Sequence, residues 1–232
     1  MSVCYGKAVI NTSVAAFLCP SDPGGSVFKQ GTNSGASVGP QFRFEFGGTT
    51  GVGVGLFAAV YASGIRDILD GTSNTVAFNE VLIGDNSAAT QNGAEKYTGL
   101  AWPDGKASGN GAGETQTMPT GANFLVQYIT SCDQRRRSRT NELNAAKQRW
   151  ISSRVYHGSF TNHLLPPNSA HADCFFYEGN AGMSTARSRH PVGVNSLFAD
   201  GSVHFLKASI NPSVWWGLGS KAGGEAISVD SY

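Results

Sequence analysis

The chain carries little charge. Charged residues make up 14% of its 232 positions, well below the usual quarter, and 17 Lys and Arg residues nearly balance 16 Asp and Glu residues. A net charge of +1 excludes a general electrostatic attraction to DNA or to anionic membranes. The same composition excludes a disordered acidic chain, a helical bundle and a coiled coil. We therefore expect no nucleic-acid partner.

Targeting and zinc-binding signals are also absent. Residues 1–5 have no charged segment ahead of a long apolar run, so they form neither a signal peptide nor a membrane span. The chain is then either cytosolic or begins after a removed targeting segment.

None of the four cysteines forms a C-x-x-C pair, which argues against a structural zinc site. Their even number suits two disulfides, and closing the shorter loops pairs Cys4 with Cys19 and Cys132 with Cys174. Four buried free thiols are the alternative.

Glycine is abundant, with 30 residues, nearly twice the usual share. Five glycines fall within residues 47–55, and residues 84–122 are polar and glycine-rich with few apolar anchors. We expect these segments to form long loops that extend from a sheet, and residues 84–122 to form a binding surface. No internal repeat or domain boundary is apparent, so residues 1–232 are expected to form one domain.

Local patterns predict more strands than helices. A β-hairpin with a two-residue Asp200-Gly201 turn is the strongest signal, and Asn211-Pro212 opens a short helix that Gly219 ends. A second helix is predicted over Glu142–Trp150, with Asn141 as its cap. The predicted strands are Val14–Cys19, Phe42–Phe46, Ile65–Leu69, Thr75–Ile83, Asn123–Ile129, Val194–Ala199 and Ser202–Lys207. The expected fold is α+β, an antiparallel sheet with long glycine-rich loops and one or two helices.

Motifs that could carry chemistry are few. Gly35-Ala-Ser37-Val-Gly39 matches the nucleophile elbow of serine hydrolases, but Pro40 follows it where that motif requires a helix. The five histidines all lie in the last third of the chain, without the i, i+4 spacing of a helical metal site. Among the histidines and carboxylates, His190 and Asp200 are the first candidates for an acid/base pair.

Five motifs occur together in order along the chain. They are Phe17–Pro23, Ile68–Thr75, Leu164–Ser169, His190–Gly201, which is an H-x9-D-G motif, and Ala222–Tyr232. With these motifs the chain resembles a large paralogous family of unknown function from planctomycete bacteria, which has a prepilin-type N-terminus and a C-terminal H-x9-D-G motif. The resemblance covers the chain from about Val14 to Tyr232 and weakens between residues 84 and 122.

The resemblance implies export and a pseudopilin-like head, in which an antiparallel sheet packs on a long apolar helix. Because this chain begins just before the first motif, we expect a globular head without that helix, at the cell surface, in the periplasm or outside the cell. An apolar sheet face exposed in this way is a candidate surface for self-association. The resemblance also makes calcium the cofactor to consider, with Asp200 and Asp230 as candidate ligands.

Two functional hypotheses follow from these observations. The first is a non-catalytic head that binds glycans or partner subunits at the cell envelope, with Trp102, Tyr97 and Trp150 as candidate ligand-binding residues. The second is a hydrolase that acts on a carbohydrate or an ester, with His190 and Asp200 as acid and base.

Overall fold

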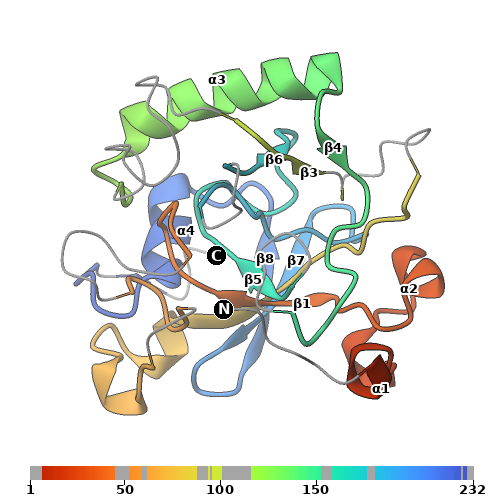
Figure 1. Ribbon diagram of the computed structural model, residues 1–232. Coiled ribbons are helices and arrows are strands. Elements are labelled where there is room, and N and C mark those ends of the chain that lie inside the picture. Colours follow the sequence, from red (N-terminus) through yellow and green to blue (C-terminus); the bar gives the residue numbers. More distant parts are fainter. Residues whose placement is uncertain are drawn as a thin grey trace.

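The computed structural model has an α+β fold whose layers are visible in Figure 1. It describes residues 7–44, 53–58, 62–87, 94, 96–100, 116–152, 158–176, 181–225 and 227–228. A long helix, α3 (Ala122–Ser138), lies on one side of the molecule, a small sheet lies beneath it, and a five-stranded sheet forms the opposite side.

The larger sheet has the strand order β5-β1-β2-β7-β8. Its neighbouring strands pair antiparallel, except that β1 pairs parallel with β5 at one edge. The bounds are β1 Ser34–Ser37, β2 Val76–Glu80, β5 Phe160–Thr161, β7 Gly193–Phe198 and β8 Val203–Lys207. Strands far apart in the sequence thus lie side by side at its centre.

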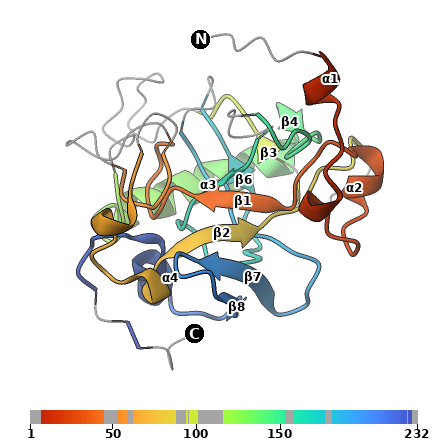
Figure 2. The same ribbon diagram turned by 90° about the horizontal axis from the view of Figure 1, so that it is seen from below.

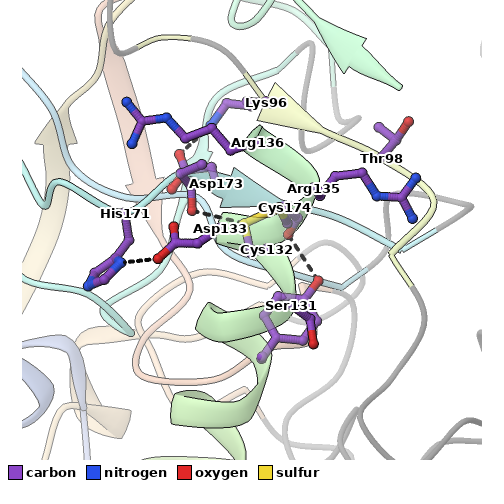
Figure 3. The surroundings of a disulfide bond; sticks show 12 residues. Lys96, Thr98, Ser131, Cys132, Asp133, Arg135, Arg136, His171, Asp173 and Cys174 are labelled. Atoms are coloured by element: carbon purple, nitrogen blue, oxygen red, sulfur yellow. Dashed lines mark hydrogen bonds and ion pairs between the residues drawn. A yellow bond between two sulfur atoms is a disulfide. The ribbon is translucent and has the colours of Figure 1, made fainter. Parts of the chain in front are cut away.

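The smaller sheet has the order β4-β3-β6, with β3 at Lys96–Tyr97, β4 at Glu142–Leu143 and β6 at Asp173–Cys174. β3 pairs antiparallel with β4 and parallel with β6. A disulfide between Cys132 and Cys174 ties α3 to β6 (Figure 3). This confirms the second predicted cysteine pair. Cys19 keeps a free thiol, and Cys4, its predicted partner, lies outside the described residues.

The C-terminal hairpin is confirmed, but its predicted two-residue turn is wrong, because the loop has three residues. β7 and β8 pair antiparallel over five residue pairs, and β2 forms the other neighbour of β7. The turn takes in Ala199 as well as Asp200 and Gly201, because the Phe198 amide donates to the Ser202 carbonyl at 2.8 Å. Gly201 has a φ of +89°, the left-handed conformation that closes a three-residue hairpin loop. Its open surroundings show that backbone conformation, and not packing, requires glycine there.

The short C-terminal helix is confirmed as well. α4 spans Pro212–Gly219, and the Asn211 side chain accepts a hydrogen bond from the Ser213 amide at its start. Its Trp215 and Leu218 are buried against the sheet with Val194 and Phe198. One face of the five-stranded sheet is therefore covered by α4. The remaining helical segments are α1 Lys7–Ile10, α2 Gly24–Val27, η1 Ala15–Phe17, η2 Ile65–Asp67 and η3 Thr72–Asn74.

Several local predictions are wrong. Residues 123–129, predicted as a strand, belong to α3, because Leu125, Tyr128 and Cys132 form a buried stripe at helical spacing. Residues 142–150, predicted as a helix, contain β4 and a turn in which Lys147 has a positive φ.

Two further strand predictions are replaced by short 3-10 turns. These turns are η1 in place of Val14–Cys19 and η2 in place of Ile65–Leu69. Of Phe42–Phe46, the described part holds only an isolated bridge at Arg43, and the remainder lies outside the described residues.

The basic run at residues 135–139 ends α3. Three arginines stand in its last turn, where cations complement the helix dipole. Arg135 donates to the Gly99 carbonyl at 2.9 Å and Arg136 to the Ala170 carbonyl at 2.8 Å. These side chains therefore join the helix end to neighbouring loops. Within the described part of the chain, no helix has both the length and the apolar character needed to cross a membrane.

Candidate functional site

Within the part of the chain that the structure describes, one face of the five-stranded sheet is left partly uncovered. Figure 2, which views the molecule from below, shows β1, β2, β7 and β8 side by side, with α3 behind them. A shallow groove of about 340 Å³ crosses this face. It is lined by Phe17, Ser34, Phe78, Asn79, Glu80, Asn195, Leu197 and Val203.

The register of the strands builds the groove as two rows. Phe78 pairs with Leu197, and Leu197 pairs with Val203, so these three side chains form an apolar row across β2, β7 and β8. The adjacent row is polar at Glu80 and Asn195 and ends at Phe205, which pairs with Asn195. Alternate residues of each strand point to the same face, which is why these side chains gather here.

The apolar row is partly exposed to solvent. Val203, which ends this row in the edge strand β8, is 63% exposed, and Phe205 in the adjacent row is 41% exposed. Phe57 packs against Phe78 with ring centroids 5.0 Å apart and extends the apolar surface beside the groove. An open apolar row of this kind is characteristic of a contact surface.

A carboxylate and an imidazole stand at the polar end of the groove. Glu80 accepts hydrogen bonds from the Asn195 backbone amide at 2.7 Å and from its side-chain amide at 3.1 Å. The Nε2 atom of His190 lies 3.4 Å from the Glu80 carboxylate, and the two side chains are 39% and 21% exposed. His190 also meets the edge of the Phe205 ring. These groups can exchange a proton or accept and donate hydrogen bonds to a bound group.

The structure does not bring His190 and Asp200 together. His190 lies beside Glu80 and Phe205, whereas Asp200 stands in the turn that follows β7. Asp200 is exposed and accepts hydrogen bonds from the Ser202 amide at 2.9 Å and hydroxyl at 2.7 Å. Those bonds lower the pKa of Asp200 and hold the hairpin turn.

The other predicted site residues are also separated. Tyr97 is 1% exposed, in the core beneath α3. Trp150 packs against Phe17 with ring centroids 5.7 Å apart and donates from Nε1 to the Thr12 carbonyl at 3.0 Å. Trp150 therefore supports one end of the groove from behind Phe17. Trp102 and Asp230 lie outside the described residues.

The histidines do not form a metal site in the described part of the chain, where no three His, Cys, Asp or Glu side chains cluster. His171 pairs with Asp133 at 2.8 Å beside the disulfide, and the two point toward each other in Figure 3. His204 contacts Ser202 at 3.0 Å. Ser37, the centre of the elbow-like motif, is fully buried in β1.

A buried polar network lies beneath the groove, on the covered face of the sheet. Asn79 accepts from the Ser196 hydroxyl at 2.7 Å and lies 3.1 Å from Nε2 of His163, whose Nδ1 lies 3.0 Å from the Trp215 carbonyl. Since a carbonyl only accepts, the network assigns the proton to Nδ1 and leaves Nε2 to accept from the Asn79 amide. The imidazole also stacks on the Trp215 ring at 3.9 Å.

This environment favours the neutral imidazole. Burial lowers the pKa of His163 to about 4, against an ordinary value of 6.5, although the hydrogen bond to the Trp215 carbonyl acts in the opposite direction. The unfolded chain therefore binds a proton that the folded chain excludes. The stabilisation is complete above pH 6.5 and is lost as the pH falls from 6.5 to about 4.

We predict that the free energy of unfolding falls by about 3 kcal/mol between pH 7 and pH 4 because of His163. Urea denaturation at half-unit pH intervals measures this slope. His163→Gln should be less stable at pH 7 and should lose most of the slope, whereas His171→Gln, a surface histidine, should keep it. A slope that is unchanged in His163→Gln would contradict the assignment.

A cluster of buried charges lies near the disulfide. Asp173 accepts from Lys96 at 2.7 Å and from the Thr185 hydroxyl at 2.6 Å, and Arg187 lies 3.4 Å away. Burial alone would raise the pKa of Asp173, but the charges of Lys96 and Arg187 outweigh it and lower the pKa to about 2. Lys147, also fully buried, donates to the Phe160 carbonyl, and burial lowers its pKa well below the ordinary value. These side chains link β3 and β6 to the segments around them. None of them lines the groove.

Comparison with known proteins identifies a family. Residues 4–213 match the model of a family described as a protein of unknown function, DUF1559. No curated protein and no solved structure matches the chain.

Proposed function

The chain belongs to DUF1559, a family of proteins of unknown function, and we propose that it is an exported, non-catalytic head domain of pseudopilin type. In this proposal the groove on the open sheet face docks a partner subunit at the cell envelope. The observation that carries it is the apolar row of Phe78, Leu197 and Val203 on a sheet face that α4 does not cover.

The lining of the groove favours a protein segment over a glycan. Sugar hydroxyls require several hydrogen-bonding partners, whereas half of the residues that line the groove are large and apolar. An apolar side chain gains about 25 cal/mol for each Å² that it buries. Glu80 and Asn195 supply polar contacts in the adjacent row.

An apolar helix fits the dimensions of this face. The groove crosses four strands, β1, β2, β7 and β8, which at a spacing of about 4.8 Å makes it about 14 Å across, the length of about ten helical residues. Glu80 is the one ionisable side chain among the described residues that line the groove. The proposed occupant is therefore a helix with an apolar face and one Lys or Arg opposite Glu80.

Export is supported by the disulfide. Cys132 and Cys174 are both buried and bonded to each other, and stable disulfides of this kind belong to oxidising compartments. The open face is also where the resemblance to prepilin-type proteins expects a helix to pack.

Two matched valines test the docking proposal. The probe is a fluorescein-labelled 20-residue helix with Leu, Ile and Phe on one face and a single Lys within that face, and binding is measured by fluorescence anisotropy. Val203→Lys should weaken binding at least 10-fold, since it places a charge in the apolar row. Val126→Lys on α3 is the matched control, because Val126 is 62% exposed and Val203 is 63% exposed. It should leave binding within twofold, since Val126 does not line the groove.

Other results would replace the proposal. Equal affinity of the two lysine variants for the helix would show that the probe binds elsewhere. Binding to a panel of soluble glycans that Val203→Lys abolishes would assign the groove to a glycan instead. Turnover of chromogenic esters or glycosides that His190→Ala abolishes would favour a hydrolase, for which the contact between His190 and Glu80 supplies the supporting observation.

A further inference from the structure

β8 is an edge strand with an unused side. Only β7 pairs with it, and among the described residues no strand pairs with its outer side. On its inner side, the Ser202 carbonyl accepts from the Phe198 amide at 2.8 Å, and the Ala208 amide donates to the Val192 carbonyl at 2.7 Å. Antiparallel pairs alternate, so the even-numbered residues of β8 bond to β7.

The odd-numbered residues of β8 therefore direct their backbone amides and carbonyls outward. These residues are Val203, Phe205 and Lys207, and all three are exposed. Their side chains lie on the open face of the sheet, so the free backbone edge and the apolar row meet along one strand. Proteins usually block such an edge with a charge, a proline or a covering segment. Lys207 is the charged residue of this strand, and it stands at the end.

The charges at the two ends of the hairpin arm have opposite signs. Asp200 stands in the turn before β8 and Lys207 is the last residue of the strand. If the strand pairs antiparallel with a copy of itself, each Lys207 comes within reach of the other copy's Asp200, and the contact is made twice by symmetry. The strand is thus complementary to itself in charge as well as in hydrogen bonding.

We propose that β8 pairs antiparallel with β8 of a second copy and joins the two sheets into one of ten strands. Val203 of one copy then lies opposite Phe205 of the other, and their apolar rows become continuous across the two-fold axis. A net charge of +1 presents little long-range repulsion between copies. This dimer is independent of the proposed docking function, because the groove remains open in it.

Charge reversal and rescue test the dimer. Sedimentation velocity of the full chain at low salt and pH 8, where imidazoles are neutral, should show a dimer that forms with increasing concentration. Lys207→Asp should raise its dissociation constant at least fivefold, since it places two acidic groups together at each end. Adding Asp200→Lys to that variant should restore the dissociation constant to within threefold of the original chain.

Arg66→Asp is the matched control. It makes the same change in net charge at a side chain that is 93% exposed and remote in sequence from β8, and it should leave the dissociation constant unchanged. A chain that stays monomeric up to about 100 μM, the upper end of ordinary assay concentrations, would overturn the proposal. An equal rise of the dimer dissociation constant in Lys207→Asp and in Arg66→Asp would also overturn it. Lys207→Asp should still bind the labelled helix, so failure of the dimer and failure of docking are distinguishable.

Discussion

Replacing Cys132 and Cys174 by alanine is expected to lower the free energy of unfolding by about 4 kcal/mol. The disulfide joins residues 42 positions apart, and in the chain-entropy account a closed loop of that size restricts the unfolded chain by this amount. Its loss leaves α3 held to β6 by core packing and by the hydrogen bond that the Tyr128 hydroxyl donates to the Cys174 carbonyl at 3.1 Å. Urea denaturation at pH 7 of the original chain and the double variant gives the difference.

Cys19 supplies the control for this experiment. It is a free, half-buried thiol, so Cys19→Ala should change stability by less than about 1 kcal/mol. Reduction with a thiol should lower the stability of the original chain and of Cys19→Ala by the same amount, and should leave the double variant unaffected. If the double variant unfolds at the same urea concentration as the original chain, the tie between α3 and β6 contributes nothing to the fold.

Replacing Asp173 by asparagine is expected to lower the free energy of unfolding by about 3–5 kcal/mol. The carboxylate faces two cations, Lys96 at 2.7 Å and Arg187 at 3.4 Å, and its own side chain is 1% exposed. The substitution keeps the shape of the side chain but leaves both cations buried without an opposite charge. Chemical denaturation at pH 7 measures the loss.

Asp133→Asn is the matched control, because Asp133 forms a half-exposed pair with His171 at 2.8 Å. That substitution should cost less than about 1 kcal/mol. Adding Lys96→Met to Asp173→Asn should recover part of the stability, since it removes one of the two buried charges. A loss of less than about 1 kcal/mol in Asp173→Asn, or no recovery in the double variant, would count against an ionised cluster at this position.

The sequence predicted best where the chemistry is local. The Asp200-Gly201 hairpin and the Asn211-Pro212 helix start depend on residues within a few positions of one another, and both are present in the structure. Turn and capping residues act through their own backbone, so tertiary packing seldom overrides them.

The long helix was missed for a physical reason. Residues 123–129 contain Phe124, Val126 and Tyr128 at alternate positions, which favours a strand when the segment is considered alone. The helix is stabilised by the buried stripe of Leu125, Tyr128 and Cys132 and by the disulfide, which lie beyond that short window. Extending the pattern as far as the arginine run would have revealed the helical spacing.

The groove could be predicted only in part. The sequence indicates His190 as a candidate site residue. Its neighbour Glu80 lies 110 positions away in the sequence, and their contact depends on the pairing of β2 with β7. One local signal was available: the hairpin carries apolar residues at both odd and even positions, such as Leu197 and Phe198, which indicates a sheet that is apolar on both faces. Tyr97, Trp102 and Trp150 are candidate ligand-binding residues by residue type alone, and residue type does not report burial.

The strand order of the larger sheet affects how the chain is made. β2 ends at residue 80, and its neighbour β7 begins at residue 193, so a ribosome that adds 5–20 residues per second needs about 6 to 23 s to reach it. Throughout that interval β2 can pair with β1 on one side, but its partner strand on the other side, β7, has not yet been made. A nascent chain of this sequence therefore remains an unfinished sheet until β7 has been synthesised. A transcript truncated ahead of β7 would yield a polypeptide with a permanently open strand, a substrate for chaperones and proteases.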